Sequence, residues 1–265
     1  MTGSKAQLAS VSRDPIEVLL SNDLLVMQEK LNGKRGLVKV KDGTTTFFNR
    51  AGEERPLPYF LKNSFRRLRG DYLFDGEIVG KKFYAFDLVQ APRLWPNASW
   101  AERGKALSHH YSLPNVEIVS TFFEKQKGEA FLLLKAARSE GVVFKDRRAP
   151  YREGRGDSWI KYKFTHDVDC VVTAVRPTGR DNLELAVYAG QTLVPVGKVS
   201  ALSGDGPRVA LGDVVTVTVL DVSESNQLIQ PVTPVIRDDK KPEECGIDQL
   251  ASARKSKLPT SGEMQ

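Results

Sequence analysis

The sequence predicts an α+β domain with antiparallel sheets and flanking helices, followed by an all-β barrel. Up to about residue 164, short runs rich in β-branched and aromatic residues alternate with turns and with two helical stretches. From residue 166 onward, strand-like runs recur at short spacing with turn signals between them, which is typical of a small barrel. We therefore expect one domain over residues 1–164 and a second over residues 165–250. Residues 251–265 lack an apolar period and are expected to form a disordered tail.

The first domain has five expected strands and two expected helices. The strands are predicted from β-branched and aromatic runs at residues 24–27, 36–40, 44–48, 77–79 and 83–88. The helices are predicted from apolar spacing near 3.6 at residues 101–108 and 129–138. In the second domain, strands are expected at residues 168–175, 183–188, 192–199 and 214–222, separated by turns at residues 178–181, 189–190 and 204–206.

Composition indicates a soluble globular protein that does not enter a membrane. Of the 265 residues, 40% are apolar and 27% are charged, and no run approaches the roughly 18 apolar residues of a membrane span. The first ten residues contain no apolar core of a secretory signal, so we expect a cytoplasmic location. The two cysteines and three histidines match no metal-ligand spacing, so any metal is expected to have oxygen ligands.

The basic residues suggest a polyanionic partner. The net charge is +6, and arginines cluster at residues 66–69 and again between residues 147 and 155. This clustering favours contact with a phosphate backbone, and the alternative is a solvated basic face.

A lysine beside a tight turn is the most informative local feature. Lys30 precedes the turn Asn32-Gly33 and lies between two apolar strand-like runs. A lysine becomes a nucleophile only after losing its proton, which requires neighbouring cations, a dry wall or a metal. Taken alone, such a lysine is typical of the surface of a hairpin turn.

Further motifs supply the groups that such a nucleophile needs. Glu77 follows an acidic turn, and Glu140 precedes a glycine and a buried strand, where its carboxylate can reach a divalent ion. Lys161 and Lys163 alternate with apolar neighbours and therefore project from one face of their strand. Two ammonium groups on one face repel each other unless an anion lies between them, and a nucleotide phosphate is the obvious candidate.

In this order, the motifs resemble those of the covalent nucleotidyltransferases, specifically the compact two-domain ATP-dependent DNA ligases, with RNA ligases and mRNA capping enzymes as relatives. The resemblance covers residues 24–250 and includes Lys30-Leu31-Asn32-Gly33 and a final Arg237-x-Asp239-Lys240-x-Pro242. It implies an adenylation domain followed by an OB-fold barrel. It also implies that Lys30 attacks the α-phosphate of ATP to form a lysyl-AMP. Asn32 departs from the aspartate that DNA ligases usually have, which keeps the turn and removes a charge.

The resemblance assigns roles to individual residues. It implies catalytic roles for Lys30, Lys161, Lys163 and Arg237. It implies nucleotide contacts for Gln28, Glu29, Lys30, Arg35, Arg50, Glu77, Phe86, Lys145, Lys161, Lys163 and Lys240. Glu77 and Glu140 are expected to bind Mg²⁺ or Mn²⁺. DNA contacts are expected for Arg50, Arg66, Arg67, Arg69 and Arg155.

The function implied is the sealing of nicks in duplex DNA by a monomer, through lysyl-AMP and then a 5′-adenylated DNA. Such an enzyme would serve DNA replication, repair or recombination, at the nucleoid or in the cytoplasm of a virus-infected host. One alternative is an RNA ligase or a guanylyl-transferring capping enzyme. The motif at residues 237–242 argues against most RNA ligases, but capping enzymes share it. A further alternative is an inactive nucleic-acid-binding module.

Overall fold

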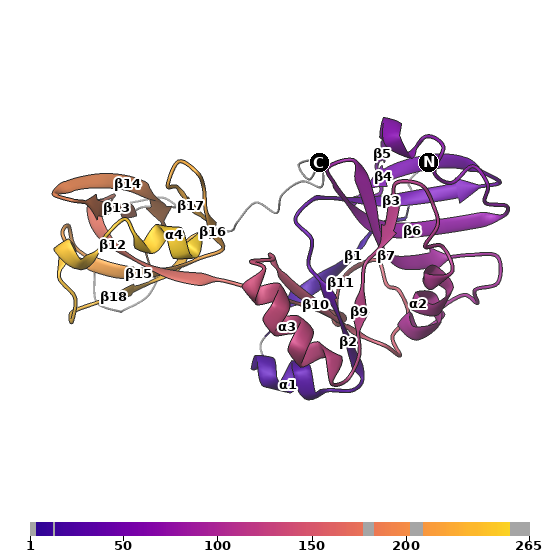
Figure 1. Cartoon of the computed structure of the whole chain (residues 1–265), viewed down its shortest axis with the longest axis horizontal. Coiled ribbons are helices and arrows are strands. Elements are labelled where there is room, and N and C mark those ends of the chain that lie inside the picture. Colours follow the sequence, from indigo (N-terminus) through magenta and orange to yellow (C-terminus); the bar gives the residue numbers. More distant parts are fainter. Residues whose placement is uncertain (1–3, 13, 177–182, 202–208, 255–265) are drawn as a thin grey trace, which may run out of the picture. The chain divides into compact units, whose positions relative to one another are not determined.

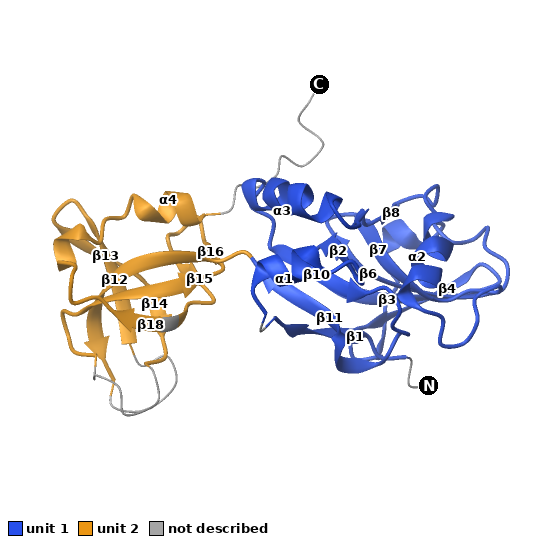
Figure 2. Ribbon diagram, turned by 90° about the horizontal axis from the view of Figure 1, so that it is seen from below, with its two compact units in different colours: residues 1–163 blue, residues 164–265 orange. Residues whose placement is uncertain are grey.

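The computed structural model describes residues 4–12, 14–176, 183–201 and 209–254. The chain divides into two compact units, residues 1–163 and 164–265 (Figures 1 and 2). Each unit has its own hydrophobic core. Over the described part of the chain, helices are too short and too polar to cross a membrane.

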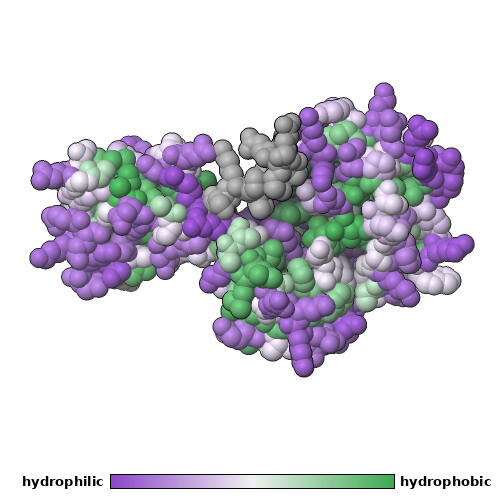
Figure 3. All heavy atoms as spheres, viewed as in Figure 1, coloured by the Kyte–Doolittle hydropathy of each residue, from purple (hydrophilic) through white to green (hydrophobic). Residues whose placement is uncertain are grey.

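The first sheet of unit 1 has five strands in the order β1-β11-β10-β2-β9. Their bounds are Gln7–Val11 (β1), Gly154–Lys163 (β11), Gly141–Asp146 (β10), Leu25–Glu29 (β2) and Thr121–Phe122 (β9). Helices α1 (Ile16–Ser21) and α3 (Gln126–Ala136) accompany this sheet. Lys127 is fully buried, and its ammonium is satisfied there by donating to the carbonyl oxygens of Asn22 and Leu25, at 2.6 and 3.1 Å. This lysine therefore fastens α3 to the end of α1. Figure 3 shows hydrophobic residues at the surface around α3, where Leu132 and Leu133 are exposed.

The second sheet of unit 1 has six strands in the order β5-β4-β3-β6-β7-β8. Their bounds are Glu54–Arg55 (β5), Thr44–Asn49 (β4), Lys34–Lys41 (β3), Asp71–Val79 (β6), Lys82–Gln90 (β7) and Val116–Ile118 (β8). One face is covered by the short helix η1 (Tyr59–Leu61) and by α2 (Trp100–Ser108). Helix α2 begins at a capping box in which Ser99 and Glu102 satisfy each other's backbone N–H groups. Phe65, Phe74 and Phe83 form the centre of the core beneath these helices.

The expected antiparallel sheets are in fact mixed. Strand β1 pairs in parallel with β11, and β7 pairs in parallel with β8. The pairing of β1 joins residues almost 150 positions apart, so local patterning does not reveal it. Helices α2 and α3 lie over the residues where sequence periodicity predicts helices, although α3 begins and ends earlier than expected.

Unit 2 is built on a five-stranded antiparallel sheet in the order β14-β13-β12-β15-β18. The bounds are Thr192–Val199 (β14), Leu183–Ala189 (β13), His166–Val175 (β12), Val214–Val219 (β15) and Val232–Ile236 (β18). A separate ribbon pairs β16 (Asp221–Val222) with β17 (Leu228–Ile229). Hydrogen bonds do not close these described strands into a barrel.

The end of unit 2 differs from the expected disordered tail. The short helix η2 (Pro242–Glu244) leads to α4 (Gln249–Ala253), so residues 251–253 are helical. Ala253 is buried in the core of unit 2, because the apolar pair Leu250 and Ala253 is spaced for one helical face. Residues 255–265 and the expected turns at residues 178–181 and 204–206 lie outside the described residues.

Candidate active site

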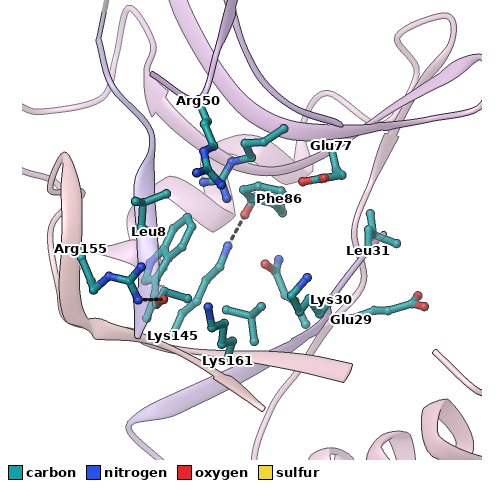
Figure 4. Close-up of a pocket in the computed structure, with 15 residues that line it drawn as sticks. Leu8, Glu29, Lys30, Leu31, Arg50, Glu77, Phe86, Lys145, Arg155 and Lys161 are labelled. Atoms are coloured by element: carbon teal, nitrogen blue, oxygen red, sulfur yellow. Dashed lines mark hydrogen bonds between the residues drawn. The ribbon is translucent and has the colours of Figure 1, made fainter. Parts of the chain in front are cut away.

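A cavity of about 250 Å³ in unit 1 is lined by residues from both sheets. Ten predicted site residues line it: Gln28, Glu29, Lys30, Arg35, Arg50, Glu77, Phe86, Lys145, Arg155 and Lys161. Figure 4 shows that Arg50, Arg155 and Lys161 reach it from different sides. The remaining lining residues are Leu8, Ala9, Leu31, Val143 and Trp159.

Lys30 follows β2 directly, and its position depends on the pairing of β2 with β10. Its backbone N–H donates to the carbonyl oxygen of Gly141 at 2.9 Å. Its Nζ lies 2.6 Å from the Oε2 of Glu140, while the Nζ of Lys163 lies 3.8 Å from the Oε1 of the same carboxylate. The Glu140 side chain is only 8% exposed, so one shielded carboxylate bridges two ammonium groups.

Two glycines, Gly33 and Gly141, allow the backbone near Lys30 and Glu140 to lie close to neighbouring strands. A Cβ at Gly33 would lie 2.3 Å from the carbonyl oxygen of Ile78, and a Cβ at Gly141 would lie 2.2 Å from that of Tyr162. Gly141 also has φ of +153°, a conformation that side chains disfavour. Glycine is therefore required beside both Lys30 and Glu140.

Arg35 is a fixed cation at one wall of the cavity. Its Nε and Nη2 donate to the two oxygens of the buried Asp75, each at 2.6 Å. Tyr151 donates to the same carboxylate at 2.6 Å, and Arg35 also donates to the backbone oxygen of Gln7 at 3.0 Å. Burial acts to lower the pKa of Arg35, but the charge and hydrogen bonds of Asp75 outweigh it and raise that pKa. The guanidinium lies 4.5 Å from the ring centroid of Phe86.

Lys145 is a buried cation enclosed by aromatic rings. Its Nζ donates to the backbone oxygen of Phe86 at 2.9 Å and lies 4.0 Å from the ring centroid of Trp159. The rings of Phe86 and Trp100 lie 4.7 and 5.8 Å away. Burial lowers the pKa of Lys145 to about 7, against the attraction of Asp87 and Asp75.

The rest of the cavity carries more positive than negative charge. The pKa of Lys161 is lowered by burial and then by the nearby cations Arg155, Lys163 and Lys30. Burial raises the pKa of Glu77, while Arg35 and Lys30 act in the opposite direction. An anion entering this cavity would relieve the repulsion among these cations.

The side chains of Gln28 and Glu29 point in opposite directions, because successive residues of β2 alternate between its two faces. Gln28 is 2% exposed and donates through its Nε2 to Thr121 at 2.9 Å, while its buried Oε1 has no partner among the described residues. The Glu29 carboxylate instead accepts a hydrogen bond from Ser139 at 2.7 Å and points away from the cavity (Figure 4). Only the backbone of Glu29 is therefore available to a ligand in the cavity.

Not all predicted basic residues gather at the cavity. Arg66, Arg67 and Arg69 follow η1 and do not line it. The Nη1 of Arg69 donates to the carbonyl oxygens of Arg66 and Leu68 at 2.9 and 3.1 Å, so its guanidinium caps its own turn. Arg155, for which a DNA contact is expected, lines the cavity, and its Nη1 lies 3.5 Å from the Ala9 carbonyl oxygen.

Arg237 and Lys240 form a second ionic cluster, in unit 2. Lys240 donates to the Oδ2 of Asp169 at 2.5 Å, and the Nη1 of Arg237 lies 3.5 Å from the Oδ1 of the same carboxylate. Arg237 also binds Asp239 through two hydrogen bonds of 2.7 and 2.8 Å, which lower the pKa of Asp239 to about 2. Thr216 donates to Asp169 as well. Burial alone would raise the pKa of Asp169, but its hydrogen bonds from Lys240 and Thr216 lower it.

Sequence reasoning missed the wall that β1 forms. Leu8 and Ala9 reach the cavity because β1 lies beside β11, a long-range parallel pairing without a local signal. Trp159, in contrast, could have been found, because it lies two residues before Lys161 and alternation places both on one face of β11.

The carboxylates of Glu77 and Glu140 are suited to bind a divalent ion whose other ligands are mainly phosphate oxygens of a substrate. Within the described ranges, three or more His, Cys, Asp or Glu side chains do not gather anywhere into a set that could hold a metal ion. Glu77 lines the cavity and Glu140 contacts Lys30 beside it. Mg²⁺ is commonly bound by one or two carboxylates together with substrate phosphates, so this donor set fits such an ion.

Comparison with known proteins gave one family match and several structural matches. The family model described as RNA ligase matches residues 23–163. The ligase domain of LigD from M. tuberculosis has a TM-score of 0.56 at 18% identity, with 91% of this chain and 97% of that chain covered. A Lig E DNA ligase has a TM-score of 0.64 at 20% identity, with 88% and 99% covered. A mycobacterial DNA ligase D complexed with ATP has a TM-score of 0.52 at 19% identity, with 91% and 97% covered. These structural similarities show a common fold. Comparison with curated proteins gave no match.

Proposed function

The chain belongs to the RNA ligase family, whose nucleotidyltransferase domain spans residues 23–163, and from this premise we propose that it is an ATP-dependent DNA ligase that seals nicks in duplex DNA. One observation carries the proposal. The amine of Lys30, paired with Glu140, lies at a cavity lined by Arg35, Lys161 and other cations, where a nucleotide phosphate would neutralise them.

The first step is a transfer of AMP to Lys30. The Nζ of Lys30, after losing its proton, attacks the α-phosphorus of ATP, so that a P–N bond forms and the P–O bond to pyrophosphate breaks. Glu140, at 2.6 Å, holds Nζ in place and is an acceptor for its proton. Lys161 and Lys163 lie near enough to stabilise charge that develops on the phosphate. Mg²⁺ or Mn²⁺ bound by Glu77, Glu140 and the phosphates would supply further charge neutralisation.

The unpaired oxygen of Gln28 supports adenine as the base of the nucleotide. A buried acceptor without a partner is costly, and the exocyclic amine of adenine is a donor that could satisfy it. The backbone of Glu29 would adjoin the same base. Phe86, which lines the cavity, would provide a ring for stacking beside Arg35 and Lys145. Glu77, Arg35 and Arg50 would then adjoin the ribose.

Unit 2 would contribute to the first step and then to the binding of DNA. We propose that it is an OB-fold domain, covering about residues 165–250, whose Arg237 and Lys240 orient the pyrophosphate leaving group. In the second step AMP passes to the 5′-phosphate at the nick, and in the third the 3′-hydroxyl attacks that phosphate and releases AMP. Arg50 and Arg155 would contact the phosphate at the nick. The enzyme would act as a monomer in the cytoplasm.

An RNA ligase is the second candidate, favoured by the family model that matches the chain. The sequence Arg237-x-Asp239-Lys240-x-Pro242 favours DNA instead, because most RNA ligases have different second domains. A capping guanylyltransferase would share this sequence but would accept GTP. The nucleotide and the strand that are accepted therefore separate the three functions.

The test is sealing of labelled nicked duplexes by the wild-type chain with ATP and Mg²⁺. We expect a nicked DNA duplex to be sealed faster than the same nick in RNA, and ATP but not GTP to form an adduct on the protein. Preferential sealing of RNA would identify an RNA ligase. A GMP adduct would identify a capping enzyme, and the absence of any adduct would refute the enzymatic function.

A further inference from the structure

We propose that a second pocket of unit 1, separate from the nucleotide cavity, binds a backbone phosphate of the nucleic acid substrate. This inference rests on the ligase function proposed above. The pocket has a volume of about 600 Å³ and lies between the segments at residues 63–68 and 109–114. Its lining residues are all different from those of the nucleotide cavity.

The polar lining of this pocket is cationic or neutral. Arg66 and Arg67 contribute two guanidinium groups, His109 and His110 contribute two imidazoles, and Asn63 and Ser112 add neutral polar groups. Its lining contains neither aspartate nor glutamate. A concave surface with several donors and positive charge is suited to a phosphate.

The two arginines are available to a ligand. Both are exposed, and within the described residues neither takes part in an ion pair. Arg69 differs, because its guanidinium is engaged with backbone carbonyl groups. Arg66 and Arg67 therefore lack the carboxylate partner that Arg35 and Arg103 of the same unit possess.

His110 is held in place by aromatic contacts. Its ring packs edge-on against Tyr72 and Phe74, with centroid distances of 5.5 Å in both cases. Burial, and secondarily the neighbouring His109, lower the pKa of His110. A neutral imidazole fixed in this way can donate one hydrogen bond to a phosphate beside the charged Arg66 and Arg67.

The pocket lies on the face of the six-stranded sheet that points away from the nucleotide cavity. On β7, Phe83 and Ala85 belong to the core beneath η1 and α2, whereas Phe86 lines the cavity. Phe74, against which His110 packs, belongs to that same core. A phosphate bound there would come from a nucleotide some distance along the strand from the reacting nick.

An exposed tyrosine favours nucleic acid over free phosphate as the ligand. Tyr111 directly follows His110 and is 79% exposed. Bases stack on exposed aromatic rings next to sites that bind the sugar-phosphate backbone, whereas inorganic phosphate has no base that could stack on a ring.

The first experiment measures the binding of nicked duplex DNA by fluorescence anisotropy over a range of salt concentrations. The variant Arg66→Gln/Arg67→Gln is compared with Lys125→Gln/Lys135→Gln, which removes the same charge from exposed positions on α3 and its N-cap. We expect the arginine variant to weaken binding about tenfold or more and to reduce the slope of log K against log salt by about 1 to 2. The lysine variant should change affinity by less than about threefold. Equal losses in the two variants would overturn the proposal.

The second experiment follows the histidine rings by NMR and does not depend on a variant folding. The chain has only three histidines, and two of them line this pocket. Nicked duplex DNA should shift the ring signals of His109 and His110. Unshifted signals in a protein that seals the nick would overturn the proposal and leave the ligase function intact. If inorganic phosphate shifts them and DNA does not, the pocket binds a free anion instead. Adduct formation at Lys30 with ATP should be equal in all variants, so a failure of the ligase function is detected separately.

Discussion

The two ionic clusters of this protein use one carboxylate to bridge two cations, but they differ in the balance of charge around it. In unit 1, Glu140 bridges Lys30 and Lys163 next to a cavity that Arg50, Arg155 and Lys161 also line. In unit 2, Asp169 bridges Lys240 and Arg237, and Arg237 has a further carboxylate partner in Asp239.

The difference indicates which cluster is prepared to receive an anion. The unit 2 cluster pairs two cations with two carboxylates and is close to neutral. The unit 1 cavity has an excess of positive charge, partly shielded from water, so a bound phosphate would gain strong interactions there. A phosphate bound by Arg237 and Lys240 would compete with Asp169 and Asp239 for these cations. Substitutions that remove members of the two clusters test this contrast.

The largest effect is expected from removing Lys30, the proposed nucleophile of the unit 1 cluster. Lys30→Ala should reduce both adduct formation with ATP and nick sealing by at least about 10³, because it removes the amine on which the proposed covalent bond forms. Radiolabelled AMP transfer to the protein measures the first step. The control is Lys34→Ala, which removes an exposed lysine of β3 and should leave both activities unchanged. An adduct that persists in Lys30→Ala would show that another residue is the nucleophile.

The next largest effect is expected from neutralising the bridging carboxylate. Glu140→Gln keeps the size of the side chain but leaves the ammonium groups of Lys30 and Lys163 without their shared counter-charge. We expect AMP transfer to fall by about 10² to 10³, since the position of Nζ is lost. Glu129→Gln, an exposed change on α3, is the control in the same radiolabel assay. Unchanged transfer in Glu140→Gln would mean that the ion pair with Lys30 plays no part in the reaction.

Much of the unit 1 cavity could be anticipated from the sequence because its residues lie in short motifs. The predicted membership in the ligase family is confirmed by the match over residues 23–163. Lys30, Glu77, Phe86 and Lys161 each occupy a strand or turn with a local signature, and the structure brings them to one cavity. Alternation along β11 also indicates Trp159, which lies two residues before Lys161 on the same face of the strand.

The features that were missed depend on contacts between distant residues. The parallel pairing of β1 with β11 joins Gln7 to Gly154, and alternation within either strand gives no indication of it. Arg155, which the family resemblance assigns to DNA, lines the cavity beside Leu8 and Ala9 of β1, and this placement depends on the same long-range pairing. Arg69 differs from Arg66 and Arg67 for a local reason, because its guanidinium donates to carbonyl groups of its own turn, and the shared charge of the three arginines does not reveal this.

A third test concerns Lys145, whose ammonium lies against the aromatic rings of Phe86 and Trp159 in unit 1. Its folded pKa of about 7 lies below the ordinary 10.5, so between these values the unfolded chain binds more protons. Its contribution to the free energy of unfolding therefore rises as pH increases from 7 to about 10, and below pH 7 the folded protein bears the full cost of burying the charge.

Lys145→Met should remove this dependence. Between pH 10 and pH 7 the free energy of unfolding should fall more in the wild type than in the variant, by a few kcal/mol in order of magnitude. Denaturant unfolding at several pH values measures this, with the exposed Lys135→Met as the control. Parallel curves for wild type and Lys145→Met would show that the rings of Trp159 and Phe86 keep the ammonium charged.

The smallest effect is expected from the neutral cluster of unit 2. Asp169→Asn removes the carboxylate that pairs with Lys240, whereas Arg237 keeps its own partner, Asp239. Because these side chains are partly exposed, we expect AMP transfer to change by less than about tenfold, and toward faster transfer since Lys240 is released. Sealing of a nick that already has a 5′-adenylate should be unchanged, because no pyrophosphate leaves in that reaction. A loss of AMP transfer as large as that of Glu140→Gln would show that Asp169 is as closely tied to the chemistry as Glu140, and the contrast between the two clusters would be wrong.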